Sequence, residues 1–133
     1  MTVSDKATQL VNTAAEAAAD KLAEDIIAFD VGEHLFITDA FLLCSAPNDR
    51  QVRAVVDEVR RRLTDIGAKP VRREGEREGR WVLLDYGDIV VHIQHSDERA
   101  YYALERLWKD CPVLPLPEKA ASAPSMYAMG ERR

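Results

Sequence analysis

The chain of 133 residues is 47% apolar and 31% charged, and its 23 acidic side chains against 18 Lys and Arg give a formal charge of −5. It has no uncharged apolar stretch of the roughly 18 residues that a membrane span needs, and its first five residues lack the basic start of a signal peptide. Cys44 and Cys111 lie too far apart for a CxxC motif, which excludes a disulfide framework and a structural zinc site. We therefore expect a soluble, cytoplasmic protein with an ordinary hydrophobic core.

The negative charge is spread over most of the chain. Residues 1–59 carry 11 acidic and 4 basic side chains, and residues 81–110 carry 6 and 3. Only residues 60–80, with 8 basic and 4 acidic side chains, are locally positive. A protein that grips phosphates needs a broader basic surface, because counterion release supplies most nucleic-acid affinity. We therefore expect a basic protein as partner, with little direct RNA contact.

The first periodic segment, residues 4–23, is predicted to be an amphipathic helix rich in alanine. Its apolar side chains recur at three- and four-residue spacing: Val3, Ala7, Leu10, Val11, Ala14, Ala18 and Leu22. Because this face is narrow, we expect the helix to lie along a sheet edge or against a second copy of the chain.

Two strands and a second helix follow. Residues 25–31 are short and rich in β-branched side chains, and residues 36–45 form a nearly continuous apolar run that is typical of a central strand. Asn48 and Gln51 have the spacing of a capping box at the start of a helix over 49–66. The glycine that follows this helix stands where a left-handed C-cap is expected.

The last third of the chain combines strands with a final helix. Pro70 begins a short strand, and its missing N–H places that strand at an edge of the sheet. Residues 81–94 are predicted to form a β-hairpin, and Ser96 to cap a helix that ends before Pro112. Three aromatic residues of this helix are expected first of all to pack inward, with a dimer contact as the alternative: Tyr101, Tyr102 and Trp108.

The element order α-β-β-α-β-β-β-α predicts an α/β fold with a mixed sheet of about five strands and flanking helices. We expect one folded domain over residues 1–110. Residues 111–133 are rich in proline and are predicted to be largely disordered after about residue 116.

The sequence contains little evidence for a catalytic or metal-binding site. His92 and His95 would point to opposite faces of a strand, which makes a poor metal pair, and Cys44 fits a small core residue. The sequence contains no G-x-S-x-G, Walker A or GxGxxG motif. We therefore expect no cofactor and no bound metal.

The best catalytic alternative is a cluster of three carboxylates. Asp39, Asp85 and Asp88 would hold Mg²⁺ and a nucleotide phosphate, as in a metal-dependent nucleotidyltransferase. Their spacing lacks the D-x-D pattern that places two carboxylates on one face of a strand. A turn over residues 85–88 is the favoured interpretation, because Asp side chains can accept hydrogen bonds from their own backbone and Gly87 is free to take positive φ.

Several blocks of the sequence form a specific set through their order and spacing. They are residues 25–31, 36–41 and 50–52, Glu74-Gly75 with Trp81 seven residues after Glu74, residues 85–93 and residues 99–108. Together they resemble the ribosomal silencing factor (Iojap) family over roughly residues 7–109. The chain departs from the usual family pattern at Ala46 and Asn48, where glycine and serine are usual.

This resemblance implies a nucleotidyltransferase-like fold without a demonstrated transferase role, and a protein that is not an enzyme. It implies a translation repressor that binds the large ribosomal subunit through its L-fourteen protein. The bound factor would sterically block association with the small subunit when nutrients are scarce. Free members of the family are commonly homodimers.

A candidate partner-binding patch combines the family blocks with the acidic character of the chain. Trp81 would be the aromatic anchor, Glu74 and Asp88 the partners for Lys or Arg, and Gly75 would allow close backbone approach. Tyr86 completes the patch. Other roles remain open at this stage, because Trp81 also fits a core position at a strand start, Gly75 a turn and Asp88 a structural role.

Overall fold

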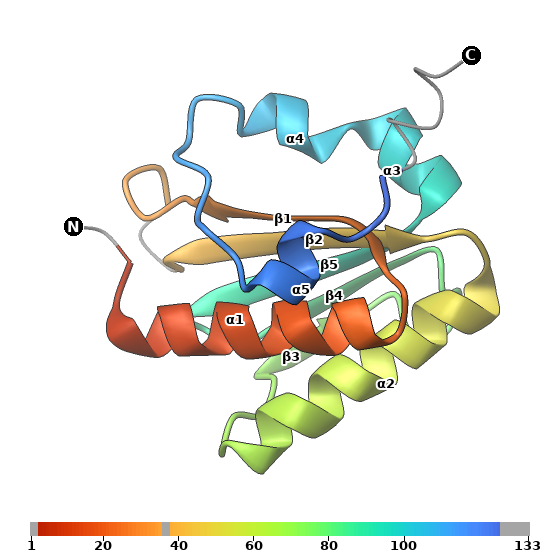
Figure 1. Ribbon diagram of the computed structural model, residues 1–133, viewed down its shortest axis with the longest axis horizontal. Helices are drawn as coiled ribbons and strands as arrows, with labels where there is room; N and C mark the ends of the chain where they lie inside the picture. The colour runs from red at the N-terminus through yellow and green to blue at the C-terminus, as the bar shows by residue number, and fades with distance from the viewer. Residues whose placement is uncertain (1–2, 36–37, 126–133) are drawn as a thin grey trace.

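The computed structural model describes residues 3–35 and 38–125, and these form a mixed α/β fold built on one sheet (Figure 1). In chain order the elements are α1 (Asp5–Asp20), β1 (Glu24–Asp30), β2 (Ala40–Ala46), α2 (Asp49–Asp65), β3 (Arg72–Glu74), β4 (Trp81–Asp85), β5 (Ile89–His95), α3 (Ser96–Tyr102), α4 (Leu104–Leu107) and α5 (Glu118–Ala121). No helix within the described ranges has the length and apolar character needed to cross a membrane.

The five strands form one mixed sheet in the order β1-β2-β5-β4-β3. β2 and β5 are parallel and the other neighbouring pairs are antiparallel. The predicted mixed sheet is therefore confirmed, together with the edge position of the strand that follows Pro70. The predicted strand from residue 36 begins later, at Ala40, and residues 36–37 lie outside the described part of the chain.

The main hydrophobic core lies between the sheet and the pair α1 and α2, which cover one face (Figure 1). α1 packs on α2 and on β1, β2 and β5, so it lies across this face rather than along a sheet edge. Ala7, Ala14 and Ala18 are fully buried there, and their small side chains let the helix approach its neighbours closely.

The ends of α2 follow the predicted capping chemistry with one difference. Asn48 accepts a hydrogen bond from the Gln51 N–H at 2.9 Å, which confirms the N-cap. The Gln51 side chain donates to the Lys21 carbonyl at 2.6 Å instead of completing the capping box. After the helix Gly67 has φ +88°, and the Ala68 N–H donates to the Leu63 carbonyl in a Schellman arrangement.

The final helix is divided into α3 and α4. His95, rather than Ser96, caps α3, because its Nδ1 accepts from the Asp97 N–H at 3.1 Å. Ala103 breaks the helix with φ +46°. Arg99 holds the geometry around this break, since its guanidinium donates to the Asp25 carbonyl at 2.9 Å and pairs with Glu105 at 3.0 Å.

The left-handed backbone at Ala103 makes a simple stability prediction. A side chain in this region costs about 1–2 kcal/mol, so Ala103→Gly should raise the free energy of unfolding by about 1 kcal/mol. Ala100→Gly, at an exposed position within α3, should lower it by about 1 kcal/mol. Urea unfolding of the two variants checks the pair, and a loss of stability in both would contradict the role given to Ala103.

The chain after residue 110 packs on the domain as far as Ser125, which differs from the predicted disorder. The Leu114 N–H donates to the Ala28 carbonyl at 2.9 Å, and the Asp30 N–H donates to the Pro112 carbonyl at 2.8 Å, so this segment covers the edge of β1. α5 then lies against α1 with Ala120 buried (Figure 1). Residues 126–133 of the predicted tail lie outside the described residues.

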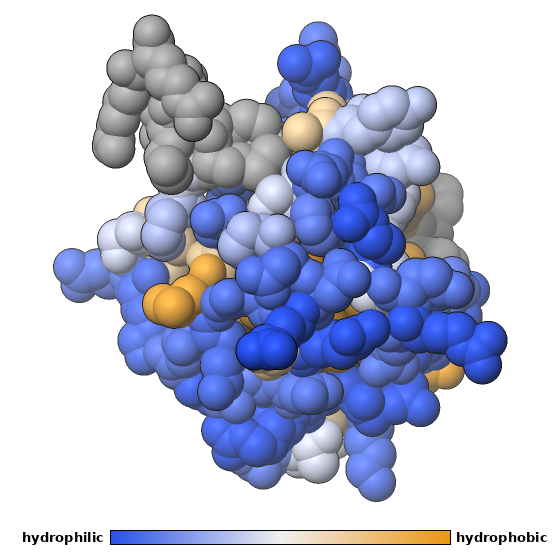
Figure 2. Space-filling model, turned by 90° about the vertical axis from the view of Figure 1, so that its right-hand side faces the viewer, coloured by the Kyte–Doolittle hydropathy of each residue, from blue (hydrophilic) through white to orange (hydrophobic). Residues whose placement is uncertain are grey.

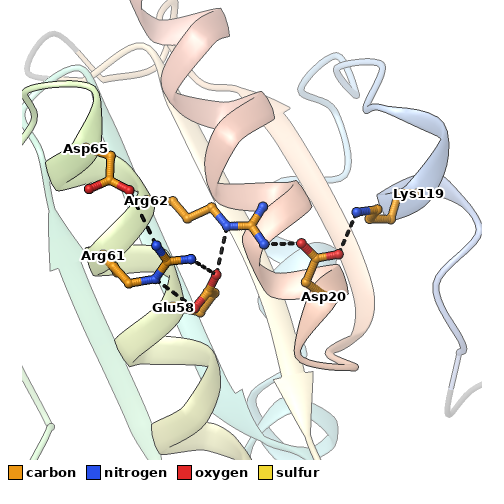
Figure 3. Close-up of polar contacts among 6 residues, drawn as sticks. All are labelled: Asp20, Glu58, Arg61, Arg62, Asp65 and Lys119. Carbon is orange, nitrogen blue, oxygen red and sulfur yellow. Dashed lines mark hydrogen bonds and ion pairs between the residues drawn. The ribbon is translucent and has the colours of Figure 1, made fainter.

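A charged network joins α5 to the two long helices (Figure 3). Asp20 of α1 accepts from Lys119 at 2.6 Å and also from Arg62, whose guanidinium reaches Glu58 as well. Hydrogen bonds from Lys119 and Arg62 lower the pKa of Asp20, and those from Arg61 and Arg62 lower the pKa of Glu58 to about 2. These carboxylates therefore stay ionised at neutral pH, and the network keeps its charges.

Candidate partner-docking surface

The predicted patch begins on the sheet face opposite α1 and α2. In β4, Val82 and Leu84 point into the main core, so the alternation of a strand places Trp81, Leu83 and Asp85 on the other face. The register sets Glu74 opposite Leu83, and His92 opposite Leu83 on the other side. Glu74, Trp81 and His92 therefore share this face.

Trp81 is half-buried and is held on two sides. Its indole Nε1–H donates to Nδ1 of His92 at 3.2 Å. Its ring centroid lies 5.0 Å from that of Tyr102, which is 49% exposed. A large aromatic side chain that is partly accessible and fixed in place has the properties of a binding anchor.

Gly75 supports the backbone of Trp81 directly. It has φ +83°, and a Cβ added to it would lie 2.0 Å from the carbonyl oxygen of Trp81. The close approach predicted from this glycine therefore occurs within the chain itself. Any side chain here would push the β3–β4 connection away from the start of β4.

Glu74 belongs to a charged group on β3 and β4 that also includes Asp85, which is partly buried and lies at the far end of β4 from Trp81. Arg72 pairs with Glu74 at 3.3 Å and with Asp85 at 3.7 Å. Exposed ion pairs of this kind contribute little to stability, so a basic partner can replace Arg72 at Glu74 at low cost.

Two residues of the predicted patch lie elsewhere. Tyr86 is 7% exposed and belongs to the core on the α2 side of the sheet, where burial raises its pKa to about 12. Asp88 lies at the tip of the β4–β5 hairpin, at the end opposite Trp81, and pairs with Lys6 at 3.3 Å. The structure therefore brings together Glu74, Gly75 and Trp81 but not Tyr86 or Asp88.

Two exposed tyrosines extend the surface, although the sequence pattern predicts that they pack inward. Tyr101 is 80% exposed, and its ring contacts Tyr102 edge-on at 4.9 Å. The inward prediction holds for Trp108, which contacts Phe41 at 5.2 Å. Tyr101 and Tyr102 lie before the break at Ala103, and Trp108 lies after it. The break ends the periodicity of a continuous helix, so the tyrosines do not point inward with Trp108.

The end of the molecule at the right of Figure 1 carries α3, which ends with Tyr101 and Tyr102. Figure 2 shows a mainly hydrophilic surface there, interrupted by separate apolar patches.

The carboxylates of the catalytic alternative each have a different partner. Asp39 accepts from the Ser4 N–H at 3.2 Å, and Asp85 accepts from the Gly87 N–H at 2.8 Å, which is the predicted turn. Asp88 pairs with Lys6 as described above. Within residues 3–35 and 38–125, no group of three or more His, Cys, Asp or Glu side chains is placed to hold a metal ion.

Comparison with known proteins decides the family. The family model described as "Ribosomal silencing factor during starvation" matches residues 4–132. The chain belongs to the ribosomal silencing factor family. The protein named ribosomal silencing factor in Bacillus subtilis is 44% identical over 107 residues, which are 80% of this chain and 91% of that protein.

A solved structure and a more distant relative agree with the membership. The crystal structure of a Bacillus halodurans protein matches with a TM-score of 0.73 and 39% identity, covering 82% of this chain and 99% of that one. A mouse protein named "Mitochondrial assembly of ribosomal large subunit protein 1" is 28% identical over 65% of this chain and 39% of its own length. The names of the Bacillus subtilis and mouse relatives both refer to the ribosome.

Proposed function

We propose that the protein represses translation by binding the large ribosomal subunit through its L-fourteen protein. The bound factor sterically blocks association with the small subunit when nutrients are limited. Family membership supports the ribosomal role, and the name of the mouse relative supports the large subunit. The protein acts in the cytoplasm as a regulator without catalysis, and the free chain forms a homodimer.

The observation that carries this proposal is the aromatic surface, by which we mean Trp81, Tyr101 and Tyr102 with Glu74 at its edge. Tryptophan and tyrosine dominate the binding energy of many protein interfaces, and here one anchor is fixed by its neighbours while two tyrosines are exposed. Glu74 offers an accessible carboxylate to a Lys or Arg of the partner. A net charge of −5 further favours a basic partner over bare RNA.

The test is co-sedimentation with isolated large subunits, followed by a sucrose gradient with both subunits. Trp81→Ala should weaken binding about 100-fold, since truncating a central aromatic anchor commonly has an effect of this size. The same variant should no longer suppress the peak of joined ribosomes, while its circular dichroism stays unchanged.

The matched control is Leu22→Ala, which removes an exposed apolar side chain just after α1, away from the aromatic surface. It should bind like the wild type. Equal binding by the Trp81 variant and the wild type would remove the aromatic surface from the proposal.

A further inference from the structure

Six aromatic rings form a continuous chain across the sheet face opposite α1 and α2. Neighbouring ring centroids lie 4.9–6.2 Å apart. The order is Trp108, Phe41, His92, Trp81, Tyr102 and Tyr101. His92, which is buried, stands between the partly buried rings of Phe41 and Trp108 and the aromatic surface.

The hydrogen bond between Trp81 and His92 fixes the chemical state of the imidazole. An indole N–H only donates, so Nδ1 of His92 must accept and the neutral ring carries its proton on Nε2. His92 is 7% exposed, and its Nε2 has no hydrogen-bond partner. Nδ1 is therefore the ring nitrogen that takes part in a hydrogen bond, and its partner is the indole N–H of Trp81.

The surroundings of His92 are those of an apolar core position. Across the sheet it pairs with Leu43 on β2 and Leu83 on β4, and Phe41 meets its ring edge-on at 5.0 Å. An apolar side chain of similar size would fill this space without leaving a buried N–H unpaired. An imidazole at this position leaves its buried Nε2–H unpaired, which lowers stability. The hydrogen bond from Trp81 to Nδ1 is the interaction that compensates for this loss.

We propose that His92 is a positioning residue, whose Nδ1 holds the Trp81 indole in the orientation that the docking partner meets. The inference rests on the proposed function of the aromatic surface. Rotation of the indole about its side-chain torsions would break the bond and displace the ring from Tyr102, so the acceptor selects one rotamer. A partner then binds a pre-organised anchor rather than one that must be ordered on binding.

Burial keeps this arrangement intact at neutral pH. It lowers the pKa of His92 to about 4, so the imidazole is uncharged in the cell and Nδ1 remains free to accept.

Two substitutions of His92 separate the acceptor from the packing. His92→Phe keeps an aromatic ring but has no acceptor, whereas His92→Asn loses the ring but places an amide oxygen near the position of Nδ1. The Phe variant should bind large subunits about 5- to 10-fold more weakly, as expected for one lost orienting hydrogen bond. The Asn variant should stay within about twofold of wild type.

A spectroscopic measurement reports the bond without any partner. In ¹⁵N-labelled protein the indole N–H signal of Trp81, assigned with Trp108→Phe, should lose its protection from solvent exchange in His92→Phe and keep it in His92→Asn. In a Trp81→Phe background, which has no indole N–H, His92→Phe should cause no further loss of binding.

The outcomes distinguish this inference from the proposed function. Failure of the wild type to bind large subunits would overturn the proposed function, and the docking role of His92 with it. If the wild type binds, unchanged binding by His92→Phe despite a lost indole bond would overturn the positioning role. Equal weakening by the Phe and Asn variants would also overturn it, because packing alone would then explain both.

Discussion

A chain that ends at Asp110 should be less stable than the full chain by about 4–6 kcal/mol, a large part of the 5–15 kcal/mol that typically separates folded from unfolded domains. The loss combines backbone hydrogen bonds to β1 with the burial of Leu114, Leu116 and Ala120 against the main core. It also uncovers the edge of β1, which then offers unpaired N–H and C=O groups to other chains. Urea unfolding at several protein concentrations measures both effects.

A matched pair of substitutions tests the same contact in the full chain. Ala120 is 1% exposed against α1, so Ala120→Glu places a carboxylate in the core and should detach α5. The neighbouring Ala121 is exposed, and Ala121→Glu should leave the unfolding midpoint close to that of wild type. Truncation without loss of stability, or equal effects of the two substitutions, would contradict a structural role for this segment.

Periodicity predicted the elements well because local physics decides them. The apolar spacing of α2, the Asn48 cap and the alternation in the β4–β5 hairpin each follow from interactions within a few residues. A helical crossover over residues 49–66 favours a parallel pairing in the sheet, and the structure shows that the parallel pair is β2 with β5. The mixed character of the sheet was therefore predictable from the sequence, whereas the strand order β1-β2-β5-β4-β3 comes from the structure.

Long-range contacts determine the two features of the fold that the sequence did not reveal, the packed segment after residue 110 and the break at Ala103. Prolines and alanines after residue 110 indicate disorder by composition, yet Leu114 and Ala120 find partners on β1 and α1. Nothing local marks Ala103 as a break, since alanine favours a helix. Arg99, bonded to Asp25 and Glu105, is the distant contact that accompanies it.

The candidate site also has features that were predictable from the sequence and one that was not. Strand alternation from Val82 and Leu84 already points Tyr86 into the main core, so its burial was predictable from the pattern. The length of the hairpin, about 3.3 Å per residue, likewise separates Asp88 from Trp81. The role of Gly75 was not predictable, because the atom it approaches is a carbonyl six residues away across a loop.

Replacement of Gly75 by alanine should cost about 3 kcal/mol or more in the free energy of unfolding. Two effects add there, a left-handed backbone with φ +83° and a Cβ that would meet the Trp81 carbonyl oxygen at 2.0 Å. Gly67 provides the matched control, because it has φ +88° with no atom within 4 Å of an added Cβ. Gly67→Ala should therefore lower the free energy of unfolding by only about 1 kcal/mol, which is the cost of the left-handed backbone.

The difference between the two alanine variants measures the contact with Trp81 alone. Relief of the clash must move either the β3–β4 connection, which directly follows Glu74, or the start of β4, which carries Trp81. Gly75→Ala should therefore also weaken binding to large subunits, measured where the variant is still folded, while Gly67→Ala binds like wild type. Equal losses of stability in the two variants would show that the connection yields freely, and Gly75 would then be an ordinary turn residue.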